Sequence, residues 1–143
     1  LSHRIHADFV YDRDATDVAT PVAAAFAQRR GVCQDFAHVM IACLRSLGLP
    51  ARYVSGYLQT TRAPGALRLA GTDESHAWVS VFALGSGWVD FDPTNDIAPS
   101  TRHVTVAWGR DYADVTPVKG VTLGGGAHVV EVAVDVEEDP LTS

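Results

Sequence analysis

The segment from residue 31 to residue 50 reads GVCQDFAHVMIACLRSLGLP and contains both cysteines of the 143-residue chain. Four apolar side chains recur along it at the spacing of one helix face, namely Phe36, Met40, Cys43 and Leu47. Gly48 and Pro50 follow this pattern directly and are typical of a helix end. The spacing therefore predicts a helix over residues 33–47 with one apolar face.

This predicted helix keeps the two cysteines apart. Ten residues of helix separate the Cα atoms of Cys33 and Cys43 by roughly 15 Å, whereas a disulfide needs about 7 Å or less. Both thiols are therefore expected to be free. Cys43 belongs to the apolar face and is interpreted as part of the core, while Cys33 stands at the first residue of the helix.

The composition is that of an ordinary globular chain. Apolar residues make up 47% and charged residues 20% of the sequence, and its length suits one domain. Eleven Lys and Arg residues against 17 Asp and Glu residues give a net charge of −6. This charge argues against nucleic acid or an anionic membrane as a partner. No apolar run approaches the about 20 residues that cross a bilayer.

The order of the predicted elements indicates the fold class. Residues 1–19 are expected to be extended, with an edge strand over 9–11, and a short helix is predicted from Thr20 as N-cap and Pro21 as first helical residue to near Gly31. A strand over 51–61 is followed by a loop over 61–74. Alternating residues predict four more strands, over 76–83, 88–92, 103–108 and 129–136. Helices followed by strands predict an α+β fold with N-terminal helices packed on an antiparallel sheet.

Cys33 is the candidate nucleophile. The first turn of a helix offers unpaired N–H groups and a partial positive charge, and both favour an anion. A thiol reacts as its thiolate, which a histidine within hydrogen-bond reach stabilises. A carboxylate behind the histidine fixes the tautomer of the ring. The sequence by itself places only the first of these features.

Six histidines compete to be the partner of Cys33. Two lie in the polar N-terminal stretch. His38 lies about 140° around the predicted helix from Cys33, so direct pairing is awkward. His103 and His128 fall at strand edges with no evident partner. His76 begins an alternating strand, but any of these side chains alone is more often structural than catalytic.

The position of the carboxylate depends on a hairpin. Asp90 and Asp92 point to the same face of the strand that follows His76. A hairpin centred on Leu84 places Asp92 opposite His76. The rival hairpin, with residues 85–87 in the loop, leaves Asp92 about 13 Å away along the strand. Only the first register is expected to bring the acid to the histidine.

Several motifs in this chain resemble those of bacterial transglutaminase-like proteins, many of which are described as candidate cysteine proteases. The segments GVCQDFA and LRSLGLPAR resemble the core around the cysteine, at residues 31–37 and 44–52. SHAWV at 75–79 and GWVDFDPTN at 87–95 resemble the histidine and aspartate motifs, in the same chain order. With the tail motifs around residues 109–117 and 129–136, the resemblance covers residues 9–137.

The resemblance implies a catalytic triad. Matched to its motifs, Cys33 is the nucleophile, His76 the general base and then acid, and Asp92 the orienting carboxylate. Asp92 is preferred over Asp90 because it occupies the Asp-Pro-Thr position. The implied fold is papain-like, and the implied activity is cysteine-dependent acyl transfer at amide bonds of proteins or peptides, by hydrolysis or transamidation.

Further expectations follow from the same resemblance. Gln34 and Trp78 are candidates for oxyanion stabilisation or substrate binding, and neither a metal nor a cofactor is expected. The chain, which begins at Leu1 rather than Met, is interpreted as a single catalytic core spanning 1–143 that lacks an upstream β-rich domain of the full-length protein. Its expected partners are that domain and a protein or peptide substrate. The oligomeric state stays open, and the unpaired thiols favour the cytoplasm.

Two other functions remain open at this point. A non-catalytic transglutaminase-like module could bind peptides or act as a scaffold. A metal site could be built from Cys33, His76 and Asp92, although no close-spaced ligand pair anchors it. Reactivity of Cys33 near pH 6 would indicate the enzyme, because an ordinary thiol is protonated there.

Overall fold

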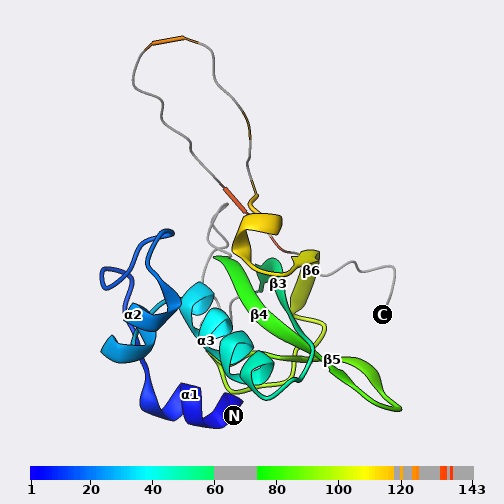
Figure 1. Ribbon diagram of the computed structural model, residues 1–143. Helices are drawn as coiled ribbons and strands as arrows, with labels where there is room; N and C mark the ends of the chain where they lie inside the picture. The colour runs from blue at the N-terminus through cyan, green and yellow to red at the C-terminus, as the bar shows by residue number, and fades with distance from the viewer. Residues whose placement is uncertain (60–73, 118–119, 121–123, 126–132, 135, 137–143) are drawn as a thin grey trace, which may run out of the picture.

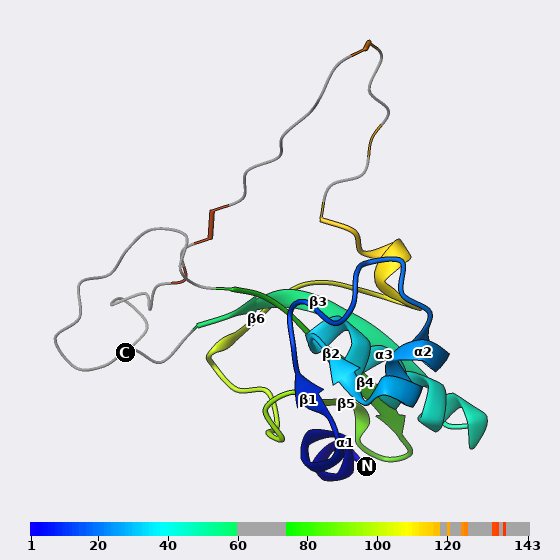
Figure 2. The same cartoon turned by 90° about the vertical axis from the view of Figure 1, so that its left-hand side faces the viewer.

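The computed structural model describes residues 1–59 and 74–117, together with 120, 124–125, 133–134 and 136. In these residues, helices pack on one face of a four-stranded sheet of order β5-β4-β3-β6 (Figures 1 and 2). All the neighbouring strands of this sheet run antiparallel. The predicted α+β fold is confirmed.

The helix α3 (Cys33–Ser46) carries the core. Its predicted bounds are confirmed to within one residue at the C-terminal end. The buried apolar side chains of α3 are Phe36, Ala37, Val39, Met40, Ile41 and Leu44. Cys43 is partly buried and packs against this cluster. Both cysteines are free, as the spacing predicted.

The sheet is built from β3 (Ala51–Leu58), β4 (Glu74–Ala83), β5 (Gly87–Phe91) and β6 (His103–Gly109). Tyr53, Ala77 and Val79 belong to the core cluster beneath α3. Because successive strand residues point to opposite faces, His76 and Trp78 belong to the other face of β4. A short 3-10 helix, η1 (Tyr112–Asp114), follows β6.

The N-terminal region differs from the prediction. Residues 2–8 form a helix, α1 (Ser2–Asp8), so the expectation of an extended segment is wrong. Ile5 is the one buried side chain of α1, and a single large apolar residue in two turns gives no helical period to recognise. The predicted edge strand is confirmed in part as β1 (Val10–Tyr11), which pairs in parallel with β2 (Arg30–Gly31).

The second helix, α2 (Val22–Gln28), begins one residue later than predicted, with Pro21 as its N-cap. The hydroxyl of Thr20 bonds Asp17 instead of capping the helix. Arg29 adopts a left-handed conformation, and this ends α2 before Gly31. Helices α1 and α2 lie beside α3 (Figure 1), and Ser2 of α1 also donates to the Asp92 carbonyl just after β5.

The β4–β5 hairpin has a register that lies between the two considered from sequence. Val79 pairs with Phe91 and Ala83 with Gly87, so the loop is Leu84, Gly85 and Ser86. The predicted hairpin was centred on Leu84, whereas the observed hairpin is centred on Gly85, so the predicted register is wrong. The predicted loop over 61–74 and the predicted strand over 129–136 fall largely outside the described residues.

Candidate active site

Cys33 is the first residue of α3, and hydrogen bonds to the Asp35 side chain tie this first turn to the residues before the helix. The Asp35 carboxylate accepts hydrogen bonds from the Val32 N–H at 2.8 Å and the Thr16 hydroxyl at 2.6 Å. Gly31 passes so close to this carboxylate that an added Cβ would lie 2.8 Å from Cγ of Asp35. Helix geometry leaves the N–H groups of Cys33 and Gln34 without an intrahelical acceptor. The thiol therefore stands beside unpaired donors in a fixed turn.

His76 and Asp92 form a buried pair. Nε2 of His76 donates to Oδ2 of Asp92 over 2.8 Å, and their side chains are 8% and 0% exposed. Extending the observed register by one residue places Asp92 opposite Trp78, so the contact with His76 is diagonal. Asp90 makes the equivalent diagonal contact, accepting from Nε1 of Trp78 over 3.1 Å. A directly opposed register was therefore unnecessary for the pair to form.

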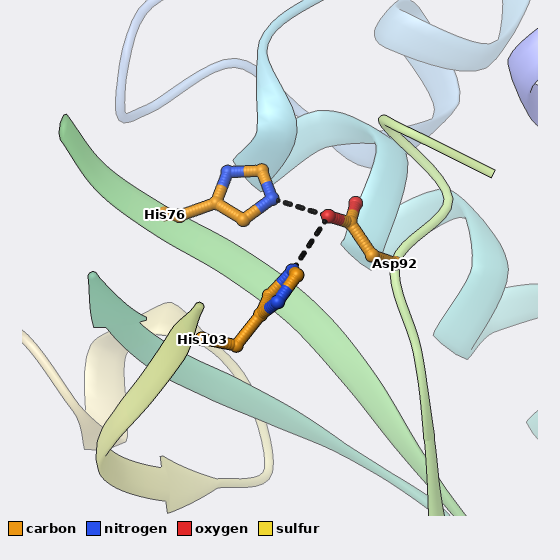
Figure 3. Close-up of side chains that lie close together, drawn as sticks. All are labelled: His76, Asp92 and His103. Atoms are coloured by element: carbon orange, nitrogen blue, oxygen red, sulfur yellow. Dashed lines mark hydrogen bonds and ion pairs between the residues drawn. The ribbon is translucent and has the colours of Figure 1, made fainter. Parts of the chain in front are cut away.

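The pKa of His76 depends on both Asp92 and Cys33. In Figure 3 the second ring nitrogen, Nδ1, points away from Asp92. Burial lowers the pKa of His76, but hydrogen bonds with Asp92 and Cys33 outweigh it and raise the pKa to about 9. His76 is thus bonded to Asp92, and the Cys33 thiol is among the groups that raise its pKa. Their catalytic roles stay a prediction.

Asp92 is the acceptor at the centre of this group. Burial raises its pKa, but hydrogen bonds from His76, Asn95 and His103 lower it to about 2. The second carboxylate oxygen, Oδ1, accepts from the backbone N–H groups of Thr94 and Asn95 at 2.9 and 3.2 Å. The carboxylate is therefore ionised and held through both oxygens.

His103 is the site residue that the sequence analysis missed. Its Nε2 lies 3.1 Å from Oδ2 of Asp92, and its side chain is 2% exposed (Figure 3). It comes from β6, which pairs with the opposite edge of β3 from β4: His76 pairs with Gly56 and His103 with Leu58. Its ring meets the ring of Trp78 edge to face, with centroids 5.3 Å apart. No motif marked His103, because its place depends on the strand order.

The two residues suggested for oxyanion or substrate contacts have their side-chain donors engaged. The Gln34 amide donates to the Val18 carbonyl over 3.4 Å. Nε1 of Trp78 donates to Asp90, while its ring lies 6.1 Å from that of His76. Either side chain would have to break this hydrogen bond before its N–H could donate to an oxyanion. The backbone N–H of Cys33 needs no such step.

A metal-ligand set is also present among the described residues. One ligand atom each from His76, Asp92 and His103 lies within 4.8 Å of the others. This set differs from the cysteine-containing set considered from sequence. The Ser100 N–H donates to Nδ1 of His103 over 3.3 Å, which puts the ring proton of neutral His103 on Nε2. Metal ligation by Nε2 needs the opposite tautomer, so His103 does not fit a metal.

Comparison with known proteins identifies the family. Residues 1–93 match the sequence model of the transglutaminase-like superfamily. This chain belongs to that superfamily. The transglutaminase-like chain is 45% identical over 141 residues to an uncharacterized protein of Mycobacterium tuberculosis, covering 95% of this chain and 45% of the relative. It thus spans about half the length of the curated relatives that it matches first.

Solved structures share the fold. The transglutaminase-like chain matches a candidate cysteine protease from Cytophaga hutchinsonii with a TM-score of 0.69 and 30% identity, over 97% of this chain and 45% of that one. It matches the periplasmic domain of TgpA from Pseudomonas aeruginosa, bound to ethylmercury, with a TM-score of 0.51 and 31% identity, over 68% and 37% of the two chains. None of the helices described is long and apolar enough to cross a membrane. Cytoplasmic location stays a prediction.

Proposed function

We propose that this transglutaminase-like chain is a cysteine-dependent acyl-transfer enzyme that acts on amide bonds of proteins or peptides. In this proposal Cys33 is the nucleophile, His76 the general base and acid, and Asp92 the orienting carboxylate. The observation that carries the proposal is the placement of His76. Its buried ring binds an ionised carboxylate through Nε2, and the Cys33 thiol at the N-terminus of α3 helps to raise its pKa to about 9.

The chemistry follows from this arrangement. The Cys33 thiolate attacks the amide carbonyl carbon, and the backbone N–H of Cys33 stabilises the oxyanion. The His76 imidazolium gives a proton to the leaving nitrogen as the C–N bond breaks, which leaves a thioester on Cys33. Water or an amine, deprotonated by His76, then attacks the thioester. The products are a carboxylic acid or a new amide, and the free thiol returns.

Two similar proteins favour different fates of the thioester, one hydrolysis and the other transfer to an amine. One matching structure is a candidate cysteine protease, which points to hydrolysis. A protein-glutamine gamma-glutamyltransferase from Pseudomonas aeruginosa is 39% identical over 75 residues, covering 52% of this chain and 11% of that protein, and points to transfer to an amine. We therefore propose the shared half-reaction, formation of a thioester at Cys33 from an amide, as the activity of this chain.

Selective alkylation of Cys33 tests the proposal. The wild-type chain is treated with limiting iodoacetamide at pH 6, and each cysteine-containing peptide is quantified by mass spectrometry. We expect rapid modification of Cys33 and little modification of Cys43, because a thiol with no cationic partner is almost fully protonated at this pH. The Cys43→Ala variant serves as the matched control and should label like the wild type.

Two results would contradict the assignment of the nucleophile. One is equal modification of Cys33 and Cys43 at pH 6, which is what a non-catalytic module predicts. The other is undiminished labelling of the Cys33→Ala variant by the same reagent. Incubation of the wild type with glutamine-containing peptides, with and without a primary amine, then separates hydrolysis from transfer through the mass of the product.

A further inference from the structure

Two histidines from different strands bind the same carboxylate oxygen. Oδ2 of Asp92 accepts from His76 at 2.8 Å, from the Asn95 amide at 2.7 Å and from His103 at 3.1 Å. Figure 3 shows the two imidazole rings approaching this oxygen from β4 and from the start of β6. The proposed triad uses only His76. The buried position of His103 therefore needs an explanation of its own.

A backbone N–H next to His103 determines which ring nitrogen carries the proton. Nδ1 accepts the N–H of Ser100 over 3.3 Å, so this nitrogen carries no proton. The proton of the neutral ring then sits on Nε2 and points at Asp92. A second proton on Nδ1 would face the Ser100 N–H and break that bond. His103 thus accepts at Nδ1 and donates from Nε2 to Asp92.

The ring of His103 is also fixed in place. It packs edge to face on Trp78, and Trp78 is fully buried and tied to Asp90 through Nε1. The charged and titratable groups around Asp92 on the described elements are His76 from β4 and His103 from β6. His3 and His6 of α1 bond Asp96 and the Thr94 carbonyl instead.

We propose that His103 is a positioning residue of this site, which holds the Asp92 carboxylate in the orientation that His76 needs. Its Nε2 adds a second histidine hydrogen bond to the carboxylate oxygen that His76 also binds. The role also applies at acidic pH. The hydrogen bond from His103 lowers the pKa of Asp92, so the carboxylate stays ionised and keeps its hold on His76 at lower pH. The proposal rests on the function proposed above, because it assigns His103 to the same triad.

Two substitutions separate this role from simple packing. His103→Leu removes the donor and keeps an apolar side chain beside Trp78. His103→Gln keeps an amide N–H for Asp92 and an amide oxygen for the Ser100 N–H, and it cannot be charged. His6→Leu, at an exposed ring of α1, is the control for loss of a histidine. Circular dichroism checks that each variant is folded.

The readout is the rate at which 2,2′-dipyridyl disulfide modifies Cys33 between pH 3 and pH 9. For His103→Leu we expect the acid limb of this profile to move up by about one pH unit, a fall of about tenfold in rate on that limb. The His103→Gln and His6→Leu variants should keep the wild-type profile. A wild-type profile for folded His103→Leu, or no rescue by His103→Gln, would overturn the proposal.

A second measurement distinguishes failure of this inference from failure of the proposed function. Nitrogen-15 NMR of labelled wild-type protein reports the tautomer of each histidine whether or not Cys33 is reactive. We expect the neutral ring of His103 to carry its proton on Nε2, because Nδ1 accepts from the Ser100 N–H. A neutral His103 with its proton on Nδ1 would contradict the inference, even if Cys33 is the nucleophile. A His103 proton on Nε2 together with an unreactive wild-type Cys33 would contradict the proposed function, and with it the positioning role.

Discussion

At the scale of single residues, two carboxylates on one strand face have different partners. Asp92 is fully buried and accepts from His76, whereas Asp90 is partly exposed and accepts from the indole N–H of Trp78. Each carboxylate makes its contact with the ring that lies diagonally across the hairpin. The difference between them is therefore one of position along β5, not of residue type, and it can be tested with matched substitutions.

We expect Asp92→Asn to slow the alkylation of Cys33 at pH 6 by at least about tenfold. Loss of the carboxylate removes the charge that holds the pKa of His76 at about 9, so less imidazolium remains to pair with the thiolate. Asp90→Asn is the matched control and should label at the wild-type rate. Equal effects of the two substitutions would show that Asp92 has no special relation to His76.

The sequence was sufficient to find Cys33, His76 and Asp92 as candidates but not to find His103. The first three stand in motifs whose chain order resembles a family, and the helix start marks Cys33 physically. His103 has neither kind of signal, and its alternating strand shows only that it lies on one of two faces. It reaches Asp92 because β3 lies between β4 and β6, and that neighbour relation is a tertiary property.

At the scale of elements, β3 is the strand that lies between β4, which carries His76, and β6, which carries His103. Gly56 pairs with His76 on one side and with Thr105 on the other, where the register with β6 shifts. A Cβ at this position would collide with the Val104 carbonyl and lie 2.7 Å from the Trp78 ring. The absence of a side chain therefore lets the indole lie across β3 and reach the ring of His103.

Gly56→Ala is expected to destabilise the fold by about 1–3 kcal/mol, the usual cost of overfilling a packed position. The added methyl group must push either Trp78 or the backbone of β6, so His103 moves with it. Urea denaturation measures the loss of stability, and NMR of the His103 ring measures the displacement. Gly125→Ala is the control, because nothing lies within 4 Å of that position. Equal stability of both variants would contradict the close packing at β3.

The elements that were predicted wrongly are those whose local pattern is weak. The helix α1 has one buried residue, so its position depends on docking beside α3 rather than on periodicity. The hairpin register was chosen to make Asp92 face His76 directly, but long side chains also meet diagonally. The strongly periodic α3 was predicted within one residue, because its apolar face spans almost four turns.

At the scale of the whole molecule, the buried pair links folding to pH. The pKa of His76 rises from 6.5 to about 9 in the folded chain, so its contribution to stability is complete below pH 6.5 and is lost as the pH rises through 9. The pKa of Asp92 falls from 3.8 to about 2, so its contribution is present above pH 3.8 and is lost as the pH falls through 2. The pair therefore stabilises the fold most between about pH 4 and pH 6.5.

The alkaline side of this range is the more informative one. On the acid side other groups contribute, such as Asp8, whose pKa is lowered by its hydrogen bond with Arg4. Between pH 6.5 and pH 9.5 we expect the free energy of unfolding, measured by urea denaturation, to fall steadily for the wild type. Asp92→Asn should flatten this slope, because its His76 no longer holds a proton more tightly in the folded state. If Asp92→Asn keeps the wild-type slope, the proton is held by something other than the His76–Asp92 pair.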